Sequence, residues 1–294
     1  DGKQFTLKVD FFSEDSQELL NSWEEDGEPS GGDEIDGELP KNLYPYQKHE
    51  IKAAIKEIEA TEAGNGITDD QQKTINELNI YRFLCGVPSD VKGAEKMMEA
   101  ATDAALACEE NGGLSHDLGR STDKCNLTTD KSTLRSVSGY INDSGSNNRE
   151  HRGHRRWCLN PPMGEAGFGH GKNGYSAMWC MDRSGKGIRK PWSYPGRGLF
   201  PHNRLHGNSW SLFLNEKAPA ADKVKVEVWK LRRRPEKAFA SNAEIEGKML
   251  PVPYVATYLN AINFEPEQGT VGKGIYWVRV SGGGVSEGYL VELY

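Results

Sequence analysis

The hydrophobic residues of this 294-residue chain change their spacing near Pro161. Before that position they recur every three or four residues, for example between Leu134 and Ile141, and after it they alternate, for example from Val224 to Val228. Spacings of three and four predict helices, whereas alternation predicts half-buried strands. Helices early in a chain and strands late in it are typical of an α+β fold, which we therefore predict.

Capping and glycine signals divide the first half of the chain into helices. Thr68 is a typical N-cap, and the acidic Asp69 and Asp70 after it favour the positive end of a helix. Glycines mark the places where helical spacing stops. The expected helices span about Tyr46–Thr61, Thr68–Gly86, Ser89–Asn111 and Asp130–Asp143.

The second half is expected to hold short strands separated by turns. Tyr175–Met181 has the spacing of a strand, and the glycine-rich stretch Gly167–Gly174 before it is typical of a turn region. Pro191–Asn203, rich in Pro and Gly, is typical of a linker. Further strands, which together predict a small β-sandwich, are expected at Trp210–Leu214, Val224–Val228, Ala261–Phe264, Gly274–Val280 and Tyr289–Tyr294.

The charge of the chain is concentrated at its beginning. Residues 1–40 contain 13 Asp or Glu and two Lys or Arg, while the whole chain has a net charge of −7. Apart from a strand signal at Phe5–Phe12, this composition predicts an acidic, flexible arm. We predict three parts: this arm over residues 1–44, an α+β domain with a leading helix over 45–188, and a β-sandwich domain over 192–294.

Several partners are excluded by composition. The acidic balance argues against nucleic acid, and the basic run from Lys230 to Lys237 is interpreted as a solvated loop or strand edge. No apolar run approaches the roughly 20 residues that cross a bilayer. No phosphate-binding glycine loop follows a strand, so nucleotide chemistry is not expected.

The five cysteines leave at least one thiol unpaired in a monomer. No Cys-x-x-Cys motif indicates a zinc knuckle or a redox site. Buried intracellular thiols, or two disulfides and one free thiol, both fit the sequence. The pairs Cys108–Cys125 and Cys158–Cys180 are the first to consider if disulfides form.

The candidate functional residues lie within a stretch of about a hundred positions. Asn79 and Arg82 share one side of a predicted helix, and His116 follows a glycine stop. His154 begins the block His-Arg-Arg-Trp-Cys-Leu-Asn-Pro, which leads into Gly167-Phe168-Gly169. These motifs are the part of the sequence that limits the range of functions the chain can have.

In their order, these motifs resemble the CAP superfamily of cysteine-rich secretory proteins, venom antigens and plant pathogenesis-related proteins. The bacterial members with SCP-like domains are the most similar. The resemblance spans about Thr74–Asp182, and it implies an α-β-α sandwich with a cleft that holds two histidines. His116 and His154 match those two histidines.

In that family the two histidines, joined by two acidic residues, bind a divalent metal such as zinc. Imidazole nitrogens at about 2.0–2.1 Å, with open positions filled by water or carboxylate, suit zinc, and a metal-bound water is a potential nucleophile. This chain departs from the pattern at the first acid, where it has Lys124–Leu127. At the second acid, Asp143 stands in.

Other residues near the two histidines have alternative interpretations. His151 is a candidate third metal ligand or a solvated side chain in a basic Arg149–Arg156 surface. Glu150, like Asp143, is a candidate catalytic base. Asn79 and Arg82 are interpreted as cleft residues that tie the fold to a carbonyl or carboxylate.

The resemblance implies a secreted or cell-surface binding or scaffold module for a small apolar ligand, a peptide or a glycan. The alternative is a zinc-dependent, peptidase-like hydrolase that uses His116 and His154. A third option is a vestigial cleft in a protein that acts through partner contacts. Because the chain begins at Asp1 without a methionine, removal of an export segment is expected. The ligand, the disulfide pairing and the oligomeric state stay open.

Overall fold

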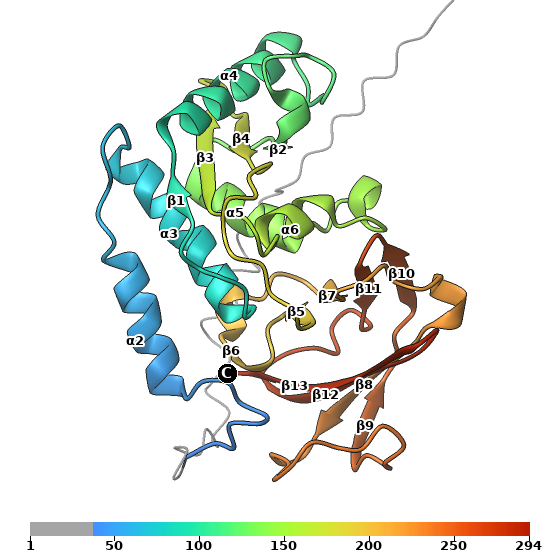
Figure 1. The fold of residues 1–294 in the computed structure, drawn as a ribbon. Coiled ribbons are helices and arrows are strands. Elements are labelled where there is room, and N and C mark those ends of the chain that lie inside the picture. The colour runs from blue at the N-terminus through green and yellow to red at the C-terminus, as the bar shows by residue number, and fades with distance from the viewer. Residues whose placement is uncertain (1–37) are drawn as a thin grey trace, which may run out of the picture. The chain divides into compact units, whose positions relative to one another are not determined.

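The computed structural model of the protein describes residues 38–294, except for the side chain of Ser146, and Leu39–Tyr294 form one compact unit. This unit contains both helices and sheets (Figure 1), so the α+β class is observed. The predicted strand Phe5–Phe12 and most of the predicted arm lie outside the described residues.

The four predicted helices are all present, and a fifth follows them. Thr68 caps α3 as expected, because its hydroxyl accepts the N–H of Gln71 and the Gln71 side chain accepts the N–H of Thr68. One start is later than predicted, since Lys92–Gly93 forms strand β1 before α4 begins. The helices are α2 (Lys48–Glu59), α3 (Asp69–Leu84), α4 (Glu95–Asn111), α5 (Thr133–Asn142) and α6 (Gly153–Cys158).

The helices pack around a four-stranded sheet of order β1-β3-β4-β2. Strand β1 is parallel to β3, and the other pairs are antiparallel. The remaining strands of this sheet are β2 (Cys125–Thr128), β3 (Glu165–His170) and β4 (Ser176–Trp179). The predicted turn region over Gly167–Gly174 is therefore wrong in its first half, which belongs to β3.

Two glycines let β3 lie directly against α4. A Cβ atom on Gly167 would stand 2.1 Å from the Met97 main-chain carbon, and one on Gly169 would stand 2.2 Å from the Thr102 main-chain nitrogen. Real Cβ atoms do not approach backbone so closely, so the Gly-Phe-Gly motif permits close packing between this strand and helix.

The two faces of the first sheet meet different helices. On one face Cys125, Leu127 and Ala177 pack in a single buried cluster with alanines of α4. Residues one position away point to the opposite face, where the Met178 sulfur lies 3.6 Å from the Cys158 Sγ of α6. The sheet thus lies between α4 and α6, and α3 and α5 also contact its strands.

The second half of the unit contains two further sheets, of order β10-β11-β7-β5 and β6-β13-β12-β8-β9. They meet through the rings of Trp210 and Tyr276, whose centroids are 5.9 Å apart. Their strands are β5 (Trp192–Tyr194), β6 (Gly198–Phe200), β7 (Trp210–Phe213), β8 (Lys225–Leu231), β9 (Gly247–Leu250), β10 (Tyr254–Tyr258), β11 (Ala261–Glu265), β12 (Gly274–Gly282) and β13 (Val285–Leu293).

The predicted linker Pro191–Asn203 is wrong, because it contains two strands that join different sheets. Strand β5 pairs with β7, and β6 pairs in parallel with β13. Tyr194 and Phe200 within this segment are fully buried. The segment therefore belongs to the core of the unit.

Across residues 38–294, none of the helices combines the length and the apolar composition needed to cross a bilayer.

Candidate functional site

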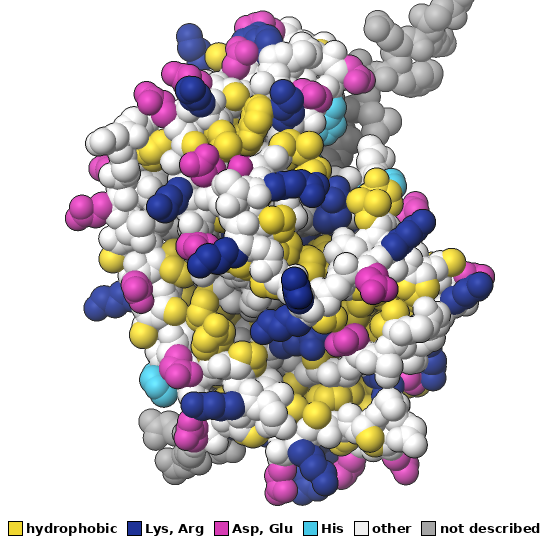
Figure 2. Space-filling model, in the orientation of Figure 1, with side chains coloured by type: hydrophobic (Ala, Val, Ile, Leu, Met, Phe, Trp, Pro, Cys, Tyr) yellow, Lys and Arg dark blue, Asp and Glu magenta, His cyan; other side chains and the backbone are white. Residues whose placement is uncertain are grey.

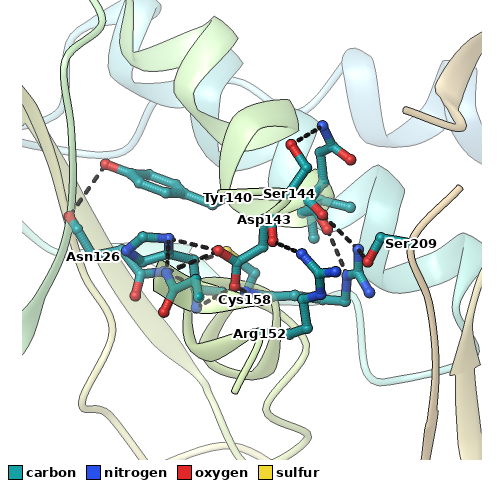
Figure 3. A network of polar contacts seen from close by, with 12 residues as sticks. Asn126, Tyr140, Asp143, Ser144, Arg152, Cys158 and Ser209 are labelled. Carbon is teal, nitrogen blue, oxygen red and sulfur yellow. Dashed lines mark hydrogen bonds and ion pairs between the residues drawn. The ribbon is translucent and has the colours of Figure 1, made fainter. Parts of the chain in front are cut away.

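The carboxylate of Asp143 is the centre of a polar network between α5 and α6 (Figure 3). Its Oδ2 accepts the main-chain N–H of His154 at 2.9 Å and that of Arg155 at 3.3 Å, both in the first turn of α6. Its Oδ1 accepts from Asn148 Nδ2 at 2.9 Å and lies 3.0 Å from His154 Nδ1. We call these four residues the Asp143 network.

The network favours one tautomer of the His154 ring. A carboxylate only accepts hydrogen bonds, so the contact with Asp143 Oδ1 favours a proton on Nδ1 and a lone pair on Nε2, although Asn148 Nδ2 also lies 3.1 Å from Nδ1. The His154 side chain is 25% exposed, whereas Asp143 is 2% exposed. The ring also packs against Tyr140, with centroids 5.4 Å apart. The site therefore offers one imidazole nitrogen as an acceptor or a metal ligand.

Asn126 of β2 closes the inner side of this site. Its Nδ2 donates to the main-chain oxygen of His154 at 3.2 Å, and its own main-chain oxygen accepts from the Tyr140 hydroxyl at 3.2 Å. Asn126 lies in the segment where the CAP pattern has its first acid. An amide at this place adds no negative charge to the site.

Arg155 joins the end of α5 to strand β7. Its guanidinium donates to the main-chain oxygens of Ile141 and Asn142, both at 2.6 Å, and to the hydroxyls of Ser211 and Ser209 at 2.7 and 3.0 Å. Burial lowers the pKa of Arg155 to about 10, which still leaves it charged at neutral pH. Arg155 is thus a structural cation behind the site.

Arg152 makes a second buried connection. It donates to the main-chain oxygen of Asp143 and forms an ion pair with Glu265 of β11, which also pairs with Arg149 at 2.6 Å. The prediction of a solvated Arg149–Arg156 surface is therefore wrong for Arg152 and Arg155, which are 1% and 0% exposed. Their charges are enclosed because carbonyls, hydroxyls and Glu265 surround them.

The side chains of Asn79 and Arg82, both on α3, form hydrogen bonds with main-chain groups. Asn79 exchanges two hydrogen bonds with Val91, at 2.8 and 3.1 Å. Arg82 donates to the carbonyls of Pro88 and Cys158, both at 2.7 Å, and to those of Asn160 and Pro161. Burial lowers the pKa of Arg82 to about 10. Asn79 thus ties α3 to the segment before β1, and Arg82 ties α3 to the end of α6 and the chain that follows it.

His116 lies in the exposed loop after α4. Its Nδ1 is 2.7 Å from the main-chain oxygen of Thr122, just before β2. In the described part of the chain, no residue makes a polar contact with both His116 and His154. The structure therefore joins His154 to Asp143, and each histidine has its own set of partners.

The other two candidate residues, His151 and Glu150, contact strands in the second half of the chain. The ring of His151 packs edge-on against Tyr258 of β10, with centroids 4.3 Å apart. Glu150 has an exposed side chain, and its main-chain oxygen accepts from Asn263 of β11 at 2.8 Å. Neither contacts His154 through a described polar interaction.

Within residues 38–294, no group of three or more His, Cys, Asp and Glu side chains is arranged to hold a metal ion. His154 Nε2, with Asp143 behind the ring, has the support that metal-binding histidines usually have. The zinc site with His116, His154 and His151 stays a prediction.

All five cysteines are free and buried, so neither Cys108–Cys125 nor Cys158–Cys180 is bonded here. Burial raises the pKa of Cys85 and of Cys180 to about 12. The thiolates of Cys85 and Cys180 are therefore disfavoured near neutral pH.

Two hollows of the described surface lie away from both histidines. One is at the edge of β8 and β9 and is lined by Lys230, Leu231, Arg232, Glu246, Gly247 and Lys248. The other lies between the start of α3 and α4 and is lined by residues that include Thr68, Gln71, Glu95, Glu99 and Asp103.

The sequence pattern identified Asp143 and His154 but not the residues that hold them. Asn126 and Arg155 had no signal of their own, because each acts through a partner distant in the chain or through main chain, and Asn148 was not singled out although its partners Asp143 and His154 lie five and six residues away. The chain matches no protein-family model, no curated protein and no solved structure.

Proposed function

We propose that this chain is a CAP-like, secreted or cell-surface binding and scaffold protein. In this proposal the first sheet with α4 and α6 is the α-β-α sandwich, and the two later sheets are the β-sandwich. Support comes from the order of the motifs and from the sheet that lies between α4 and α6. The position of Asp143 beside His154 adds to this support.

The observation that favours binding over hydrolysis is the state of the Asp143 carboxylate. It has four described donors: two main-chain N–H groups, the Asn148 amide and the His154 ring. A carboxylate has about four lone-pair positions, so little capacity remains for activating water. Asn126 is neutral and does not replace this base. A general base must reach the proton it removes, and Asp143 faces inward.

The ligand in this proposal is a small apolar molecule, a peptide or a glycan. His154 Nε2 accepts a hydrogen bond from its hydroxyl or amide, and the buried Tyr140 ring packs against the imidazole and supports it. In this proposal His116 lies on the opposite side of the same cleft.

The test is a binding screen with the whole chain. An apolar fluorescent dye, a peptide library and a neutral glycan array serve as probes. We expect one class to bind, and His154→Ala to weaken that binding at least tenfold. His49→Ala changes an exposed histidine on α2 and is the matched control. Binding that survives His154→Ala unchanged, or turnover of peptides by the wild type, contradicts the proposal.

The hydrogen bond between Asp143 and His154 Nδ1 favours one second candidate, the zinc-dependent hydrolase. A carboxylate behind an imidazole raises its basicity and fixes Nε2 as the metal-binding atom. His116 is the second ligand in this reading, and Glu150 is the candidate base. Elemental analysis after mild purification tests it: stoichiometric zinc lost in both His116→Ala and His154→Ala supports the hydrolase. Wild-type protein without metal contradicts it.

A further inference from the structure

Arg156 differs from the other buried arginines around α6. Arg82, Arg152 and Arg155 each donate to carbonyls, hydroxyls or a carboxylate. Arg156 is half-buried, has no described side-chain hydrogen bond or ion pair, and its Nε is enclosed without a partner. Within residues 38–294 its Nε is therefore an unmatched buried donor, and its two terminal nitrogens have no described acceptor.

Aromatic rings surround this guanidinium. It lies 4.7 Å from the ring centre of Trp157 and 6.0 Å from that of Tyr258. Both rings are half-buried, so part of each faces solvent. Cation–π attraction holds the charge in place but provides no hydrogen-bond acceptor. We call Arg156, Trp157, Tyr258 and Arg183 the Arg156 platform.

The platform has an excess of positive charge. Burial lowers the pKa of Arg156, and the nearby Arg183 acts in the same direction. Arg183 is exposed and, like Arg156, has no described acidic partner. A guanidinium stays charged at any physiological pH, and within residues 38–294 neither arginine has a described acidic partner. An anionic ligand would relieve both the repulsion and the unmatched donors.

We propose that the Arg156 platform binds the carboxylate of an acidic sugar. The planar fork of a guanidinium matches the two oxygens of a carboxylate. The exposed parts of Trp157 and Tyr258 suit the apolar C–H face of a sugar ring. A singly charged carboxylate is favoured over a phosphate because the half-buried position makes removal of water from a dianion more costly.

This surface is separate from the Asp143 network. Arg156 shares no polar contact with Asp143 or His154, and Tyr258 comes from β10, beside α6 (Figure 1). On the face of the molecule in Figure 2, Lys and Arg side chains lie among hydrophobic ones. The proposal does not depend on the function proposed for His154.

The test uses the full chain with trigalacturonic acid as the acidic probe and maltotriose as its neutral counterpart. Calorimetry measures affinity, and the Nε–H signals of arginines in ¹H–¹⁵N spectra report the contact. The variants are Arg156→Lys, which keeps the charge without the fork, and Arg183→Gln. Arg135→Gln on α5 removes an exposed arginine that pairs with Asp130 and is the matched control.

The expected result is that trigalacturonate binds at least tenfold more tightly than maltotriose and shifts one Arg Nε–H signal. Arg156→Lys should lower this affinity at least tenfold and Arg183→Gln about threefold, whereas Arg135→Gln should not change it. Because Arg183 is exposed, its variant tests the platform even if position 156 affects folding. Equal binding of the two sugars, equal competition by inorganic phosphate, or unchanged affinity in both platform variants would overturn the proposal.

Discussion

The Asp143 carboxylate accepts a hydrogen bond from the main-chain N–H of His154, at 2.9 Å, and its Oδ1 lies 3.0 Å from the ring Nδ1 of the same residue. One acid thus starts α6 and orients the imidazole that α6 carries. Folding of this helix and presentation of His154 Nε2 are consequently coupled.

Replacing Asp143 by Asn should destabilise the protein. Asp143 has a φ of +46°, which Asn tolerates, so the change removes charge with little backbone strain. Hydrogen bonds to a charged group contribute about 1.5–3 kcal/mol each and are not additive, so we expect a loss of about 2–3 kcal/mol. Urea unfolding measures it, with His154→Ala as the control for the ring alone. An Asp143→Asn variant as stable as the wild type would disprove the coupling.

Replacing two neighbouring arginines on α6 should change the free energy of unfolding by different amounts. Arg155→Met leaves the carbonyls of Ile141 and Asn142 and the Ser209 hydroxyl without their buried donor, and should cost about 3–5 kcal/mol in total. Arg156→Met removes donors that have no described acceptor. It should change stability by less than about 1 kcal/mol. Equal losses in thermal or urea unfolding would contradict these roles.

The glycines of β3 are expected to tolerate no side chain. Gly167→Ala and Gly169→Ala place a methyl group against the α4 main chain, and each should cost about 1–3 kcal/mol or more through overpacking. Gly139→Ala on α5 meets nothing within 4 Å, so it should stabilise the helix by roughly 0.5–1 kcal/mol. The urea midpoints of the three variants test this. If Gly167→Ala and Gly169→Ala had the same midpoint as Gly139→Ala, β3 and α4 would not be in close contact.

Asp182 should make the protein sensitive to acid. Burial would raise the pKa of Asp182, but hydrogen bonds from Ser184, Gly164 and Glu165 outweigh it and lower the pKa to about 2. The unfolded chain therefore binds this proton more readily, near the ordinary value of 3.8. Its stabilisation is present above pH 3.8 and lost as the pH falls toward 2.

Unfolding free energies measured across this pH range, for the wild type and Asp182→Asn, test the assignment. The difference between the two proteins should shrink as the pH falls. A constant difference would mean that Asp182 does not titrate with folding.

Local signals in the sequence predicted the helices well. Thr68 and the glycine stops act within one turn, so their effects do not depend on the rest of the fold. The strands β5 and β6 were predicted as a linker because Pro and Gly dominate the segment. Their pairing partners, β7 and β13, are distant in the chain, and tertiary contacts override local preference there.

The candidate site was predicted in part. The resemblance identified Asp143 and His154, which the structure joins. It gave no sign that Arg155 is buried, because its hydroxyl partners Ser209 and Ser211 lie more than fifty residues later. A run of basic residues is normally solvated, so only the fold distinguishes Arg155 from the half-buried Arg156.

The most direct test of the account is the protonation of the His154 ring, read from long-range ¹H–¹⁵N spectra of the neutral form. We predict a proton on Nδ1, an unprotonated Nε2, and loss of this preference in Asp143→Asn. A proton on Nε2 in the wild type would show that Asp143 does not orient the ring, and would contradict both proposed functions of this site.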